Sequence, residues 1–121
     1  MANKTELGAW GEALAAEFLR SRGVSIVERN YRTRYGEIDI IAQSGGYLIF
    51  AEVKLRKSTF FGAACEFVDA RKQEKLRVTA SLWLEAHETG LQPRFDVIEI
   101  YAPDGMQTKH PQIRQIEDAF I

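Results

Sequence analysis

With 121 residues, 45% of them hydrophobic and 27% charged, this chain has the size and composition of one globular domain. A single cysteine, Cys65, excludes an internal disulfide, and two histidines are too few for a typical structural zinc site. The net charge of −1 gives no simple argument for a polyanionic partner, and no apolar run suits a membrane span or a signal peptide, so we expect a cytoplasmic protein with no membrane partner.

The first half of the chain is predicted to form a helix and three strands. Apolar residues at helical spacing predict a helix over 5–22, with Asn3 and Glu6 as a capping box and Gly23 at its end. Alternating and β-branched residues predict the strands that follow, over 24–32, 36–43 and 47–54.

The second half begins with a predicted loop over 55–67 that contains Phe60, Phe61 and Gly62. Asp69 is expected to cap a helix running to about His87, with a buried stripe of Leu76, Ala80 and Trp83. A strand over 94–101, a turn at 103–105 and a final edge strand in the tail complete the chain. The order α-β-β-β-α-β, with a last β, favours one α/β domain: a three-strand meander, with the strand after the long helix inserted parallel to a neighbour.

The turn between the second and third strands predicts which residues face each other. With Gly45 and Gly46 in a tight turn, the register pairs Asp39 with Glu52 and Glu37 with Lys54. Residues two apart on a strand share a face, so all four side chains would project from the same side of the hairpin.

Opposed acids in such apolar strands need a cation. Two carboxylates about 5 Å apart repel by roughly 3 kcal/mol at an effective dielectric near 20. Lys54 supplies one positive charge, and hard oxygen ligands at this spacing suit Mg²⁺ or Mn²⁺. The alternative is an ordinary cross-strand salt bridge on an exposed face, but three acids and one lysine in mid-sheet favour a metal site.

The segments GEIDII at 36–41 and FAEVKLR at 50–56 resemble the PD-(D/E)xK nuclease signature, an acid followed after a spacer by acid-x-lysine. The chain is more closely similar to the YraN-like family, which is related to archaeal Holliday junction resolvases. This similarity extends over almost the whole chain and includes Gly11, Glu12, Asn30, Tyr31, Arg32, Phe61, Gly62, Val68, Lys72, Lys75, Leu76, Ala80, Trp83, Leu84, Arg94, Phe95, Asp96 and Val97. It implies a restriction-endonuclease-like, three-layer α/β/α fold with a central mixed β-sheet.

The resemblance also implies roles for individual residues. Asp39, Glu52 and the backbone carbonyl of Val53 would bind the metal, and Lys54 would orient or deprotonate the attacking water. Glu12 resembles a helix-borne glutamate that reaches the metal, often through water; a solvated helix residue is an equally weighted alternative. On the second helix, Gln73 or Lys72 would approach the metal, and Gln73 is the better catalytic candidate. Glu37 would tune Lys54, whereas Asp96 and His87 are expected to be structural.

Basic residues concentrate in the part of the chain that contains these acids. Residues 20–77 carry twelve Lys or Arg and seven Asp or Glu, whereas both flanking segments are acidic. From charge alone, ordinary fluctuation along a sequence is the slightly better explanation. Together with the acids, the pattern predicts a phosphate-binding rim made of Arg29, Arg32, Arg34, Arg56 and Lys57, with Lys72 nearby.

Three functions compete. The leading one is a metal-dependent endonuclease acting on structured or branched DNA, with Mg²⁺ or Mn²⁺ as cofactor. The second is a non-catalytic nucleic-acid-binding module that retains the nuclease fold, and the third is a structural or partner-binding protein. A homodimer is expected only by analogy with resolvases, because a four-way junction has two symmetric cuts.

Overall fold

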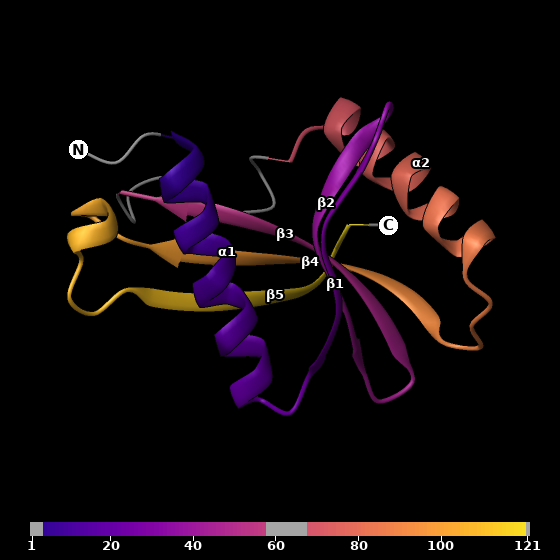
Figure 1. Cartoon of the computed structure of the whole chain (residues 1–121), viewed down its shortest axis with the longest axis horizontal. Helices are drawn as coiled ribbons and strands as arrows, with labels where there is room; N and C mark the ends of the chain where they lie inside the picture. Colours follow the sequence, from indigo (N-terminus) through magenta and orange to yellow (C-terminus); the bar gives the residue numbers. More distant parts are fainter. Residues whose placement is uncertain (1–3, 58–67, 121) are drawn as a thin grey trace.

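A computed structural model describes residues 4–57 and 68–120 and shows one five-stranded sheet flanked by two helices (Figure 1). The elements in chain order are α1 (Lys4–Ser21), β1 (Ser25–Thr33), β2 (Gly36–Ser44), β3 (Tyr47–Arg56), α2 (Ala70–Ala86), β4 (Gln92–Tyr101), a 3-10 turn η2 (Gly105–Gln107) and β5 (Gln112–Phe120). Asn3, Cys65 and the loop residues Phe60, Phe61 and Gly62 lie outside the described residues. The predicted fold class and element order are confirmed.

The sheet has the order β1-β2-β3-β4-β5, and its one parallel pair is β3 with β4. The predicted meander, the parallel insertion after the long helix and the final edge strand are therefore confirmed. The hairpin register is also the predicted one, with pairs running from Ser44–Tyr47 to Ile40–Ala51. Beyond Ile40 the β1–β2 pair diverges from β3 towards α2 (Figure 1).

Each face of the sheet packs against one helix because alternate strand residues point to opposite sides. On the α1 face, the core contains Ala15, Leu19, Ile40, Ile49 and Ile98. On the α2 face, it contains Leu76, Ala80, Trp83, Phe50 and Val97, so the predicted helical stripe is confirmed. Within the described ranges, no helix is long and apolar enough to cross a lipid bilayer.

Two predicted structural residues have different outcomes. Asp96 is fully buried and accepts hydrogen bonds from Arg94, Gln115 and the Asp118 N–H at 2.9–3.0 Å, which confirms a structural role. His87, expected on the buried stripe, is instead exposed at the C-cap, because α2 ends at Ala86. Its ring stacks on Trp83 with 4.0 Å between ring centroids.

Helix α1 approaches β3 closely at Gly11. A β-carbon at this position would lie 2.9 Å from Cδ1 and 3.1 Å from Cγ of Leu55. Gly8, one turn earlier in the same helix, has no heavy atom within 4 Å of the equivalent position. The two glycines therefore differ in packing although both lie inside one helix.

We expect Gly8→Ala to raise the free energy of unfolding by about 0.5–1 kcal/mol, because alanine is the better helix former. Gly11→Ala should not be stabilised in this way, because its methyl group must displace Leu55. We expect this variant to be at least roughly 1 kcal/mol less stable than Gly8→Ala. Urea unfolding of the two variants tests the difference. Equal stabilisation by both substitutions would contradict the close contact between α1 and β3.

Candidate functional site

Asp39 of β2 and Glu52 of β3 lie near each other where the two strands stop pairing. Glu52 is only 7% exposed and Asp39 is half-buried. Asp39 Oδ2 accepts a hydrogen bond from the Val53 N–H at 2.8 Å, which holds the carboxylate against β3. The structure therefore brings together the two acids that the hairpin register predicts.

The environment of Asp39 disfavours its charged form. Burial, and then the negative charge of Glu52, raise the pKa of Asp39 to about 7, while the hydrogen bond from Val53 acts in the opposite direction. Glu12 and Glu37 add smaller repulsive contributions to this pKa. Asp39 forms no ion pair with any of the described residues, and a cation bound nearby would favour its charged form.

Glu52, in contrast, has two lysines beside it. Its Oε1 atom lies 2.5 Å from Lys72 Nζ and 3.9 Å from Lys54 Nζ. Burial, and next the positive charge of Lys72, lower the pKa of Lys54. A lowered pKa makes the Lys54 ammonium a readier proton donor than that of a solvated lysine.

Glu12 reaches the site from α1. It is half-buried, and burial raises its pKa despite the positive charge of Arg29. Glu12 accepts hydrogen bonds from the Asp39 carboxyl and, with the Asn30 amide turned so that nitrogen faces it, from Asn30 Nδ2 at 2.6 Å. The structure thus places Glu12 beside Asp39 rather than in open solvent.

Asn30 is a site residue to which sequence reasoning assigned no role. Its φ of 55° lies in the left-handed region, which asparagine tolerates better than most residues. Asparagine is unfavourable inside a strand, and its presence in a predicted strand was the available signal that this residue has another role. The residue with this backbone conformation is also the one whose side chain contacts Glu12.

The donor chemistry fits a hard divalent cation, although no ready-made cluster is present. Within residues 4–57 and 68–120, no three His, Cys, Asp or Glu side chains are grouped so as to hold a metal. The candidate ligands are the carboxylates of Asp39 and Glu52 and the carbonyl of Val53, all of them oxygens of the kind Mg²⁺ and Mn²⁺ prefer. The observation that supports this fit is Asp39, whose pKa is raised to about 7 and which forms no ion pair with any described residue.

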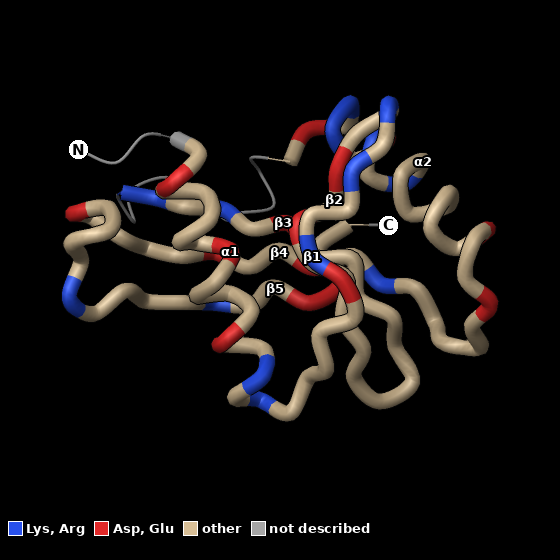
Figure 2. The backbone as a smooth tube through the Cα atoms, viewed as in Figure 1, with Lys and Arg blue, Asp and Glu red and all other residues tan. Residues whose placement is uncertain are grey.

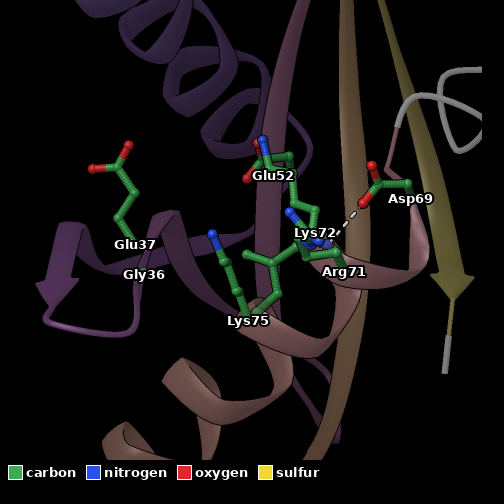
Figure 3. Close-up of a pocket in the computed structure, with 8 residues that line it drawn as sticks. Gly36, Glu37, Glu52, Asp69, Arg71, Lys72 and Lys75 are labelled. Atoms are coloured by element: carbon green, nitrogen blue, oxygen red, sulfur yellow. Dashed lines mark hydrogen bonds and ion pairs between the residues drawn. The ribbon is translucent and has the colours of Figure 1, made fainter.

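Two cavities flank the acids. The one beside α1, of about 350 Å³, is lined by residues that include Glu12, Asn30, Asp39 and Val53. The one beside α2, of about 340 Å³, is lined by Gly36, Glu37, Glu52, Asp69, Arg71, Lys72, Lys75 and Leu76. Figure 3 shows Lys72 and Lys75 extending from α2 towards Glu52. Arg71 and Lys75 were not predicted as site residues; the basic run at the start of α2 was the available signal.

The structure corrects two predicted positions. Gln73 does not approach the acids: its Nε2 donates to the Val68 carbonyl at 2.8 Å, and its Oε1 accepts from Arg77. Lys72, one residue earlier and about 100° round the helix, takes that place.

Glu37 does not face Lys54 as predicted. It forms an exposed ion pair with Arg32 at 3.1 Å, because the paired part of β2 and β3 ends before this position.

The predicted basic rim is only partly present. Arg29, Arg32, Arg34 and Lys57 are exposed. Arg56 is not part of such a rim, because its side chain is only 10% exposed and its Nη1 lies 2.7 Å from Glu99 Oε2. Figure 2 shows basic residues at the β1–β2 turn next to those at the start of α2, and Arg32, Arg34 and Lys75 line one cavity.

Asp39→Asn should stabilise the metal-free protein at alkaline pH. The folded pKa of about 7 exceeds the ordinary value of 3.8, so the stability that the protonated carboxyl contributes is present below about pH 4 and is lost as the pH rises through 7. Asparagine stays neutral and keeps an acceptor for the Val53 N–H. Urea unfolding in EDTA should show a gain of roughly 2–4 kcal/mol at pH 8 that disappears near pH 4. The exposed Glu17→Gln is the control, and a gain independent of pH would contradict the assignment.

Comparison with known proteins places this geometry in a family. Residues 11–100 match a family described as "Uncharacterised protein family UPF0102". The chain is similar to a UPF0102 protein of Rhodococcus opacus (strain B4), with 44% identity over 99% of this chain and 100% of the relative. It is also similar to those of Syntrophomonas wolfei, with 42% identity over 95% and 97%, and Symbiobacterium thermophilum, with 46% identity over 94% and 95%. The chain therefore belongs to the UPF0102 family.

Proposed function

We propose that this protein is a cytoplasmic, metal-dependent endonuclease that hydrolyses phosphodiester bonds in structured or branched DNA. The observation that carries the proposal is the acid pair of half-buried Asp39 and buried Glu52, with Lys54 beside Glu52. Membership of the PD-(D/E)xK superfamily, which the order of these residues resembles, is part of the proposal. A homodimer would present two such sites to a symmetric branched substrate.

The residues divide the chemistry among themselves. Asp39, Glu52 and the Val53 carbonyl would hold Mg²⁺ or Mn²⁺, which when bound polarises the scissile phosphate and makes hydroxide available near neutral pH. Lys54, with its lowered pKa, is suited to accept a proton from the attacking water or to stabilise charge on the phosphate. Glu12 buttresses Asp39 from the α1 side.

A binding module without cleavage is the second candidate, and one contact favours it. Lys72 forms an ion pair with the Glu52 carboxylate, the group that a metal would need. In a nuclease fold that no longer uses metal, a lysine is the expected neutralising partner. Metal binding and cleavage therefore decide between the two candidates.

Lys54→Met should abolish most of the cleavage without abolishing metal binding. Loss of a positioned proton acceptor or charge-stabilising group should lower the rate roughly 100-fold or more. The assay is a panel of linear, flapped and four-way DNA substrates with Mg²⁺ and with Mn²⁺, and the exposed Lys109→Met is the matched control. If wild type and Lys54→Met cleave equally, Lys54 is only an ion-pair partner. If wild type binds DNA but cleaves no substrate, the binding module replaces the enzyme.

Lys72→Met should tighten metal binding, because the substitution removes a cation that contacts Glu52. We expect the Kd for Mn²⁺, measured by calorimetry, to fall roughly tenfold, which corresponds to about 1.4 kcal/mol. Asp39→Asn should weaken Mn²⁺ binding in the same assay. Unchanged affinity in Lys72→Met would show that the lysine does not compete with metal, and no binding by any variant would favour the binding module.

A further inference from the structure

The turn between β1 and β2 displays an aromatic ring that the core does not use. Tyr35 is 47% exposed, and the guanidinium of Arg34 lies over its ring, 5.0 Å from the centroid. The turn itself is well ordered by local bonds: the Tyr35 N–H donates to Thr33 Oγ1, and that hydroxyl donates to the Gly36 carbonyl, both at 3.1 Å. These bonds hold the backbone of the turn, and so the point on the surface from which the ring projects.

A basic cavity of about 340 Å³ lies beside this ring. It is lined by Arg32, Thr33, Arg34, Tyr35, Gly36, Glu37 and Lys75. Three cationic side chains share it with a single acid, Glu37, which is paired with Arg32. The remaining positive charge and the neighbouring aromatic face are the combination that binds a nucleotide, through its phosphate and its base.

This cavity adjoins the one beside α2, which Glu52 lines. Gly36, Glu37 and Lys75 line both cavities, and the second of them holds Glu52 and Lys72. The two volumes meet because the β1–β2 turn packs on α2: a β-carbon on Gly36 would lie 3.0 Å from Thr79 Oγ1 and 3.6 Å from Lys75 Cβ. A strand with a phosphate at Glu52 that continues past Lys75 would thus pass next to Tyr35.

We propose that Tyr35 and Arg34 form a stacking site for one unpaired base of a bound DNA strand, with Lys75 contacting its phosphate. A base inside a duplex is already stacked on its neighbours and must be unstacked before an aromatic side chain can take it, whereas an unpaired base offers a free face. The inference rests on the proposed function and narrows it: the preferred substrate carries a single-stranded segment beside the scissile bond.

Binding is measured by fluorescence anisotropy in EDTA, so that no cleavage occurs, with a forked DNA and a blunt duplex of the same length. Tyr35→Ala should weaken binding of the forked DNA by about 5- to 100-fold and change duplex binding less than twofold. Tyr35→Phe should bind like wild type. Tyr47→Ala is the matched control, because Tyr47 is 43% exposed, has the Arg94 guanidinium 4.7 Å from its ring centroid and lies at the β2–β3 turn, away from the acids.

The other outcomes overturn the inference in distinguishable ways. If Tyr35→Ala weakens both DNAs equally or neither, the stacking site is absent, while the proposed function stands. The cavity is instead a site for a free nucleotide if two results are found together. First, dTMP displaces the forked DNA from wild type but not from Tyr35→Ala. Second, dTMP binds wild type with a Kd equal to or lower than that of the forked DNA. If wild type binds neither DNA, the inference and the proposed function both fail.

Discussion

At the point where β2 and β3 stop pairing, the Val53 N–H donates to a side chain, the carboxylate of Asp39. A buried N–H needs an acceptor, and here the acceptor is also the acid around which the site is arranged. Because the ladder ends there, β2 leaves β3 with its partner β1 and passes towards α2 (Figure 1). The space between the diverging strands admits Lys72 from the helix and leaves Glu52 in the lining of the cavity beside α2.

Charge is distributed unevenly across this space. Both lysines lie on the Glu52 side, whereas Asp39 and Glu12 share the other side, and each has a raised pKa. Burial is the main cause of the raised pKa of both acids, so these pKa values follow from where the fold places the two side chains. An added cation would act mainly on the Asp39 side, because no described residue forms an ion pair with Asp39.

Local patterns in the sequence were sufficient for the elements, the fold class and the face on which the acids lie. Hydrophobic periodicity located α1, α2 and the strands, and the two-glycine turn fixed the hairpin register through Ile40 and Ala51. What these patterns do not contain is the point at which the ladder ends, which depends on how β1, β2 and α2 pack together. Glu37 therefore contacts Arg32 instead of Lys54.

The other differences between the predicted and the observed site concern where long side chains reach. A shift of one residue along α2 turns a side chain by about 100°, enough to bring Lys72 rather than Gln73 to Glu52. Arg56 pairs with Glu99 of β4, a residue 43 positions away in the chain, so its burial depends on a strand pairing that the local sequence around it does not encode. Asn30 contacts Glu12 across two elements, and the sequence shows only its unfavourable place in a strand.

The close approach of Gly36 to Thr79 affects the dimensions of the site. With no β-carbon at Gly36, the β1–β2 turn packs closely against the side of α2, next to the cavity that Lys75 and the turn both line. A larger residue there would act as a spacer, moving one wall outward while leaving every acid and lysine of the site chemically intact. The closeness of the turn to α2 thus depends on the absence of a side chain at Gly36, a residue that lines both cavities.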